Sequence, residues 1–325
     1  MSAVDVKQAT ATTLGRAHVR PISPPKTSVW QQIWRDRVML LFVLPGVLYF
    51  VLFRYVPLLG NVIAFEDYLP FIGFESPFVG FANFQGMVQD AAFWQAVSNT
   101  ILIALMQLVF YFPAPICLAL ILHGVISTKV RRIIQSVVYL PHFISWVIVV
   151  ALWQQVLGGS GIFVHTLRDL GLPALNVMTE PSLFKPLVTL QLIWKECGYA
   201  TIIYLAALLN IDSALYEAAV VDGAGPWQRL WNITLPGILG VTILLLILRL
   251  GLALTSDFQQ ILLQRNAVGP AAGEVLDTYV YFKGIVGGQW GVTAAAGLIK
   301  GIIGTLLVLG ANKFAHRMGQ EGVYS

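Results

Sequence analysis

Charge is scarce in this sequence. Only 11% of its 325 residues are Asp, Glu, Lys or Arg, whereas 57% are hydrophobic, and the mean hydropathy is +0.74. An ordinary soluble domain carries about a quarter charged residues. The composition therefore excludes such a domain and indicates a chain that lies in a lipid bilayer.

Cysteine and the common catalytic motifs are also scarce. The two cysteines, Cys117 and Cys197, lie in apolar segments without the spacing of a metal site, so no metal is expected. No G-x-x-x-x-G-K-[ST] phosphate loop occurs, so we expect no ATP hydrolysis by this chain. Neither H-E-x-x-H nor G-x-S-x-G occurs, which argues against a membrane protease or a related enzyme. We expect a protein that is not an enzyme and has no nucleic-acid partner.

Long apolar runs are what the sequence has instead. A helix needs roughly 20 apolar residues to cross the hydrocarbon core of a membrane. The runs predict an all-α integral membrane protein of about six transmembrane helices. They lie at Val38–Phe53 with a continuation to Ala64, and at Ala96–Leu122, Ile133–Leu157, Leu187–Leu209, Ile238–Leu254 and Val292–Ala311. Gly297 and Gly301, with Gly304 after them, predict close packing of the last helix on a neighbour.

Lys and Arg are distributed unevenly between these runs. Residues 1–37 contain six of them, whereas residues 55–95 contain none. Short connections rich in Lys and Arg stay in the cytoplasm, so we expect a multi-pass protein of the cell inner membrane with a cytoplasmic N-terminus. The predicted organisation is a cytoplasmic polar tail at 1–37, a transmembrane domain at 38–315 and a cytoplasmic C-terminal tail at 316–325.

The connection between the fourth and fifth runs, residues 212–236, predicts two short helices. Asp212 or Ser213 can cap the first helix, and Gly223 suits the left-handed position that ends it. Pro226 suits the first turn of the second helix. The expected result is a helix, a tight turn and another helix on the inner face of the membrane.

The same connection matches a known signature. Its fixed points are Glu217, Ala218, Ala219, Gly223, Ile233, Leu235 and Pro236. In this respect the chain resembles the membrane subunits of type I ATP-binding-cassette importers, whose EAA loop carries these residues. The resemblance implies that Glu217, Ala218, Ala219, Asp222 and Gly223 belong to a cytoplasmic coupling helix that sits in a groove of a separate ATPase.

Other stretches resemble the carbohydrate branch of that family. Residues 80–84 (Gly-Phe-Ala-Asn-Phe), followed by Phe93-Trp94 and Asn99-Thr100, resemble the start of the second span in carbohydrate permeases. Residues 139–146 and 63–68 resemble the branch that handles complex polysaccharides, including alginate importers. The resemblance therefore implies a permease for oligosaccharides or polysaccharides, including acidic ones such as alginate.

The resemblance covers residues 38–315 and also implies partners. They are a second permease subunit, two cytoplasmic ATPase subunits that bind ATP and Mg²⁺, an extracytoplasmic solute-binding protein, the saccharide and membrane lipid. No cofactor is expected in this chain itself. The alternatives are an amino-acid or peptide importer of the same class, and a secondary transporter driven by an ion gradient. The last would need acidic relays in the spans, for which Glu196 and Asp257 are the candidates.

Three cationic residues, Lys195, Arg249 and Lys300, lie inside apolar runs. A charge at such depth costs a few kcal/mol, so each should face protein or a water-filled path rather than lipid. One interpretation is a basic lining of the translocation path for an anionic substrate. The other is internal pairing, such as that of Lys195 with Glu196. A pair of Arg249 with Asp257 on one helix is not favoured, because eight residues span about 12 Å along the axis.

Overall fold

The computed structural model describes residues 34–317, 319 and 322. The predicted polar tail before residue 34, and most of the predicted C-terminal tail, lie outside the described residues. The chain divides into two compact units, Met1–Leu59 and Gly60–Ser325. Where the structure describes it, the chain is helical and contains no strand, only an isolated bridge between Glu66 and Phe78.

The first unit contains most of the first predicted span. It consists of α2 (Arg37–Phe50), a π-helical turn η1 (Val51–Tyr55) and the start of the 3₁₀ helix η2 (Val56–Phe65), which continues into the second unit. None of the residues of α2 and η1 is buried. A helix that is apolar and exposed along its length needs lipid or another protein around it.

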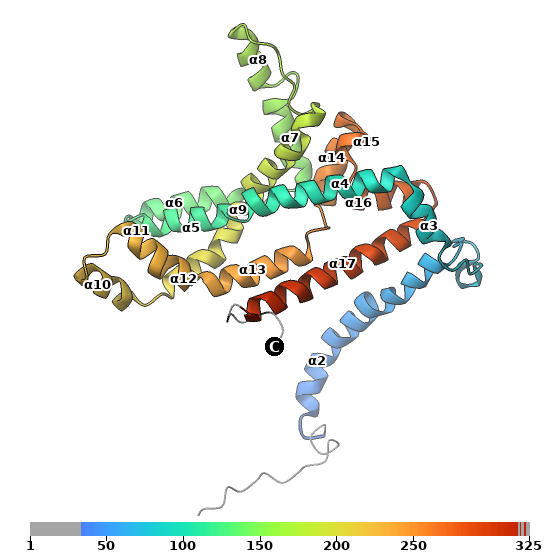
Figure 1. Cartoon of the computed structure of the whole chain (residues 1–325), viewed down its shortest axis with the longest axis horizontal. Coiled ribbons are helices and arrows are strands. Elements are labelled where there is room, and N and C mark those ends of the chain that lie inside the picture. The colour runs from blue at the N-terminus through green and yellow to red at the C-terminus, as the bar shows by residue number, and fades with distance from the viewer. Residues whose placement is uncertain (1–33, 318, 320–321, 323–325) are drawn as a thin grey trace, which may run out of the picture. The chain divides into compact units, whose positions relative to one another are not determined.

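Within the part of the chain that the structure describes, all the other helices belong to the second unit (Figure 1). In chain order they are η3 (Gly73–Glu75), α3 (Ala82–Gln89), α4 (Ala91–Met106), η4 (Gln107–Tyr111), α5 (Ala114–Gly124), α6 (Thr128–Tyr139), η5 (Leu140–Phe143), α7 (Trp146–Leu157), α8 (Ile162–Asp169), η6 (Pro181–Leu183), α9 (Phe184–Leu209), α10 (Ser213–Val221), α11 (Pro226–Arg229), η7 (Leu230–Thr234), α12 (Leu235–Gly237), α13 (Leu239–Gly251), α14 (Phe258–Val268), α15 (Pro270–Gly273), α16 (Leu276–Val280), η8 (Tyr281–Val286) and α17 (Trp290–Arg317).

Five helical stretches in the described part of the chain are long and apolar enough to cross a membrane. They are Arg37–Phe65, Ala91–Gly124, Trp146–Asp169, Pro181–Leu209 and Trp290–Arg317. Pro226–Gly237 and Leu239–Gly251 pass the same test together, with a bend of 56° between them, and so form a sixth candidate span. The predicted all-α architecture of about six spans is confirmed.

The third predicted run is not one continuous helix. It is divided into α6, η5 and α7, with an extended backbone at Ile144 and Ser145 between the last two. Pro141 contributes to the interruption, because a proline inside a helix removes a backbone hydrogen bond. A run of apolar letters therefore overestimated the continuity of this span.

The core of the second unit is built around α9. Half of the 26 residues of this helix are buried. Tyr204 and Leu208 of α9 pack against Ala119 of α5, and Val188 of α9 packs with Ile261 of α14. Apolar packing against α5 and against α14 makes α9 the common support of the two ends of this unit.

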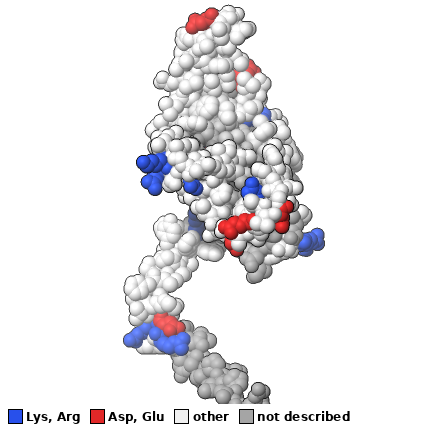
Figure 2. Space-filling model, turned by 90° about the vertical axis from the view of Figure 1, so that its left-hand side faces the viewer, with Lys and Arg blue, Asp and Glu red and all other residues white. Residues whose placement is uncertain are grey.

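Charge is sparse on the surface as well. Figure 2 shows a face on which Lys, Arg, Asp and Glu form a few small groups separated by uncharged surface. Large apolar side chains are exposed along most spans. A protein with such a surface requires a lipid environment, as the composition predicted.

Candidate functional site

The connection at residues 212–236 folds as two short helices, as predicted. The Asp212 side chain accepts a hydrogen bond from the backbone N–H of Ala214 at 2.9 Å, so Asp212 caps α10. Gly223 follows α10 with φ of +75°, a left-handed conformation that favours glycine. Pro226 begins α11. The predicted cap, turn and helix start are confirmed. The five residues predicted for the coupling helix, Glu217, Ala218, Ala219, Asp222 and Gly223, stand on α10 and the turn after it.

The exposed face of this connection is suited to a protein partner. No residue of α10 is buried. Glu217, Ala218, Asp222 and Gly223 are exposed, and Ala219 is half-buried. Nearby Val221 is 87% exposed, and the indole-bearing Trp227 and Trp231 are also exposed. Such a patch of apolar side chains beside free carboxylates is typical of a surface that another protein covers. We call residues 212–236 the coupling segment.

The coupling segment is connected to the spans on both sides. The hydroxyls of Tyr216 and Thr234 lie 3.0 Å apart, which ties α10 to the base of the fifth span. Asp212 caps α10 only three residues after α9 ends at Leu209. A short connection therefore joins α10 to α9.

Lys195 is buried, and its ammonium has partners in α9, η5 and α7. Its ammonium donates to the backbone carbonyl of His142 at 2.8 Å and to the carboxylate of Glu196 at 2.9 Å. It also lies 5.5 Å from the ring centroid of Trp146. The predicted pairing with Glu196 is present, so the Lys195 charge is neutralised within the chain.

Arg249 is half-buried and its hydrogen-bonding partner is uncharged. Its guanidinium donates to the side-chain carbonyl of Gln107 and lies 5.1 Å from the ring centroid of Tyr111. Gln107 and Tyr111 are the two ends of η4, a π-helical turn of the kind that often marks functional sites. Asp257 lies within electrostatic range of Arg249 and of Lys195 without a hydrogen bond to either. Arg249 and Lys195 therefore belong to one polar region inside the spans.

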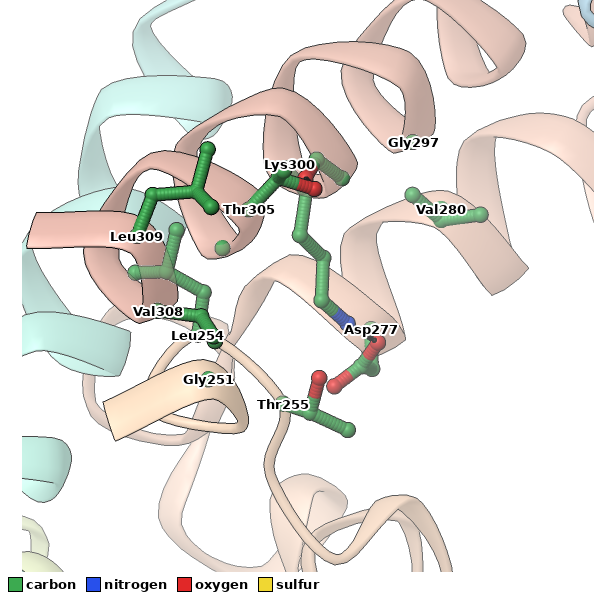
Figure 3. A pocket seen from close by; sticks show the side chains of 12 residues that line it. Gly251, Leu254, Thr255, Asp277, Val280, Gly297, Lys300, Thr305, Val308 and Leu309 are labelled. Atoms are coloured by element: carbon green, nitrogen blue, oxygen red, sulfur yellow. Dashed lines mark hydrogen bonds and ion pairs between the residues drawn. The ribbon is translucent and has the colours of Figure 1, made fainter. Parts of the chain in front are cut away.

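Lys300 is paired elsewhere. Its ammonium bonds the carboxylate of Asp277 in α16, whose other oxygen accepts from the backbone N–H of Ser256 at 3.0 Å. The pair lies in a cavity of about 590 Å³ between α13, α16 and α17, with Thr255 beside it (Figure 3). Gly297 and Gly301 form part of the wall and have no neighbouring atom within 4 Å of the position of a β-carbon. The surface predicted for close packing is thus open at Gly297 and Gly301. At Gly304 a β-carbon would lie 3.2 Å from the carbonyl oxygen of Gly251, so α17 packs closely on α13 there, as predicted.

Several polar contacts that the sequence did not reveal hold together the end of the second unit at the start of α9. We call it the outer end, after the orientation predicted from the distribution of Lys and Arg. Gln191 of α9 exchanges hydrogen bonds of 2.9 to 3.0 Å with Gln260 and Gln264 of α14. Arg265 forms an ion pair with Glu274 that is largely buried. The only signal in the sequence was the spacing of four residues between Gln260 and Gln264, which places both on one face of α14. Their partner Gln191 is distant in the sequence, and Glu274, the partner of Arg265, lies outside α14.

The residues that resemble the start of the second span in carbohydrate permeases make contacts within the fold. Asn83 donates to the carbonyls of Ala64 and Glu66 at 3.1 and 2.9 Å. Asn99 donates to the carbonyl of Glu274 at 2.9 Å, and Thr100 accepts from the backbone N–H of Leu276. These side chains fasten connections to α3 and α4 and so fix the outer end of the second span.

Asp90 begins α4 at the same end and neutralises Lys283. Its carboxylate lies 2.8 Å from the Lys283 ammonium and accepts from the Tyr279 hydroxyl at 3.0 Å. Burial alone would raise the pKa of Asp90, but hydrogen bonds from Lys283, the Ala92 amide and Tyr279 outweigh it and lower that pKa. Asp90 therefore stays ionised as the cap of α4.

Comparison with known proteins yields related membrane components. Residues 112–320 match the family model described as "Binding-protein-dependent transport system inner membrane component". The chain is 41% identical over 292 residues to the polygalacturonan/rhamnogalacturonan transport system permease protein YteP of Bacillus subtilis (strain 168), covering 89% of this chain and 91% of YteP. It is 40% identical to protein LplB of the same organism, covering 89% of this chain and 92% of LplB.

The structural comparison agrees. The fold matches a chain of a bacterial alginate ABC transporter, crystallised in complex with an alginate pentasaccharide-bound periplasmic protein, with a TM-score of 0.84 and 36% sequence identity. The match covers 91% of this chain and 99% of that chain.

Proposed function

Because this chain belongs to the family of binding-protein-dependent transport system inner membrane components, we propose that it is a permease subunit of an ATP-driven importer. It forms half of the translocation path for oligosaccharides or polysaccharides. The observation that carries this proposal is the similarity along nearly the whole chain to a polygalacturonan/rhamnogalacturonan permease and to an alginate importer. That similarity does not favour an amino-acid importer or an ion-driven transporter.

ATP hydrolysis takes place in a separate subunit. The coupling segment supports this proposal. Its exposed Glu217 carboxylate and the small side chains of Ala218 and Ala219 form a protruding surface that can fit into a cleft of a partner protein. The chain has no phosphate loop of its own. Two ATPases on the cytoplasmic side bind ATP and Mg²⁺, and their closure moves α10 and with it α9.

The other partners follow from the same family. A second permease completes the path, and a solute-binding protein delivers saccharide on the outer face. The N-terminus is cytoplasmic, since six Lys and Arg precede the first span and none occurs in residues 55–95. This orientation puts the coupling segment on the side where ATP is available.

The substrate is an acidic saccharide, and Arg249 favours it. Of the three cations predicted for the translocation path, Lys195 and Lys300 each bond a carboxylate, whereas the Arg249 guanidinium bonds the neutral amide of Gln107. Arg249 thus retains capacity to bind a carboxylate of a substrate, and Tyr111 beside it offers an aromatic face to a sugar ring. Asp257 tempers this charge without forming a hydrogen bond to Arg249.

Uptake of labelled oligosaccharides by the complete importer in proteoliposomes tests the proposal. An oligogalacturonide and a neutral oligosaccharide of equal length are compared. If the importer takes up neither saccharide when ATP is supplied, the assignment is contradicted. Arg249→Gln should weaken uptake of the acidic saccharide about tenfold more than that of the neutral one, since the loss is electrostatic. Lys300→Gln is the matched control, because it breaks an internal pair and should affect both saccharides alike. If Arg249→Gln, like Lys300→Gln, lowered the uptake of the acidic and the neutral saccharide equally, a role for Arg249 in selecting charge would be excluded.

A further inference from the structure

The third span is interrupted between η5 and α7 by two residues with extended backbone. η5 ends at Phe143, and Ile144 and Ser145 are extended, with ψ of 138° and 153°. The Ser145 side chain makes no capping bond to α7. Two helices joined through extended residues can change their mutual angle at the cost of a few torsions. We call residues 140–145 the joint.

One turn of α9 holds the joint. The Nδ1 of His142 lies 2.6 Å from Oε2 of Glu196, while Lys195 donates to the carbonyl of the same histidine at 2.8 Å. The ring of Tyr199 stacks on the imidazole at 4.0 Å with an interplanar angle of 5°. At Gly198 a β-carbon would lie 2.2 Å from the carbonyl oxygen of Val138, so α6 touches the backbone of α9. α9 thus contacts the backbone carbonyl, the ring edge and the ring face of His142.

Apart from the Lys195 ammonium, which lies 5.5 Å from the ring centroid of Trp146, the contacts between α7 and α9 are apolar. Trp146 and Val149 of α7 pack on Leu192 of α9. Apolar contacts are not directional and allow packed helices to slide by small amounts. The hydrogen bonds to His142 are directional, so they resist a change of angle at the joint. The side chains of His142 and Glu196 remain 29% and 22% exposed, so water can replace this bond when it breaks.

α9 connects this grip to the coupling segment without interruption. The helix runs from Phe184 to Leu209 as one element, and about 15 Å of it separate Tyr199 from its end. Resting on the proposed function, we propose that the hydrogen bond between His142 and Glu196 is a latch. It makes the joint follow α9, so that movement of α10 reaches α7 and the outer segment α8 instead of being absorbed at Ile144 and Ser145.

His142→Phe tests the latch. Phenylalanine keeps a ring on Tyr199 but removes the hydrogen bond to Glu196. In the complete importer this variant should keep basal ATPase activity and lose about tenfold in saccharide transported per ATP. His165→Phe, at an exposed histidine of α8, is the matched control and should behave as wild type. Wild-type coupling in His142→Phe would overturn the proposal. Absence of transport in the wild-type importer would instead contradict the proposed function.

A reversible cross-link separates the latch from a general loss of structure. In a variant with Cys117→Ser and Cys197→Ala, the changes His142→Cys and Glu196→Cys remove the latch and provide two thiols. A short bis-methanethiosulfonate reagent should restore transport per ATP, and reduction should abolish it again. If cross-linking leaves the saccharide transported per ATP unchanged, the latch is contradicted.

Discussion

The coupling segment and the outer end of the second unit are held together in opposite ways. In the coupling segment, Asp212 and Gly223 set the structure through contacts within a few residues, and α10 has no buried residue. At the outer end, buried side chains such as Gln191 and Gln264 bond across 73 residues of sequence. The first region leaves its side chains free for a partner, whereas the second uses them up internally.

This difference teaches where the molecule can change without loss of its fold. Each buried polar group at the outer end needs its partner, because an unsatisfied group away from water is costly. Among the side chains of α10, only Tyr216 has a hydrogen-bonding partner to lose, the hydroxyl of Thr234. Substitutions at the outer end should therefore reduce stability, whereas substitutions on α10 should reduce function and leave stability almost unchanged.

The largest loss of stability is expected for Glu274→Ala. It leaves the Arg265 guanidinium, whose side chain is only 12% exposed, without its carboxylate. Removing one partner of a buried ion pair costs about 3–5 kcal/mol. Thermal unfolding of the purified chain in detergent measures the loss. The double change Arg265→Met with Glu274→Leu should recover most of it, and no recovery would show that the pair itself is not the cause.

Gly198→Ala should cause the next largest loss. The added β-carbon would meet the Val138 carbonyl at 2.2 Å, and overpacking of this kind costs about 1–3 kcal/mol. Gly301→Ala on α17 is the matched control, because no atom lies within 4 Å of its β-carbon position. Its stability should change by less than about 0.5 kcal/mol. Equal effects of the two substitutions on unfolding would contradict the packing of α6 on α9.

Asp212→Ala should have the smallest effect on stability. It removes the cap of α10, which is worth about 1 kcal/mol to the helix, but α10 supports no buried core. Global unfolding should hardly change, while amide hydrogen exchange in α10 should become faster. Protection of α10 at the wild-type level would show that the cap is not what orders the coupling segment.

The sequence predicted those features that depend on near neighbours. The cap at Asp212, the turn at Gly223 and the start at Pro226 each require only the local chain, and all three are confirmed. The number and helical nature of the spans followed from apolar length alone. Burial of a whole hydrophobic helix needs no knowledge of its neighbours.

Contacts between distant elements could not be predicted in the same way. Lys300 had no carboxylate one turn away on its own helix, and its partner Asp277 lies on α16. Arg249 finds Gln107, which is 142 residues distant in sequence. His142 offered no metal-ligand spacing, yet it bonds Glu196. Such pairs depend on which helices pack together, and a single sequence does not contain that information.

Glu217→Lys tests the central claim, that α10 couples a separate ATPase to transport, most directly. The measurement is ATP-driven saccharide uptake and co-purification of the ATPase, with Glu75→Lys, at an exposed carboxylate of η3, as the matched control. Reversal of the Glu217 charge should leave unfolding of the chain unchanged and lower uptake at least about tenfold, through loss of the ATPase or of coupling. Uptake and co-purification at the level of the Glu75→Lys control would contradict the claim.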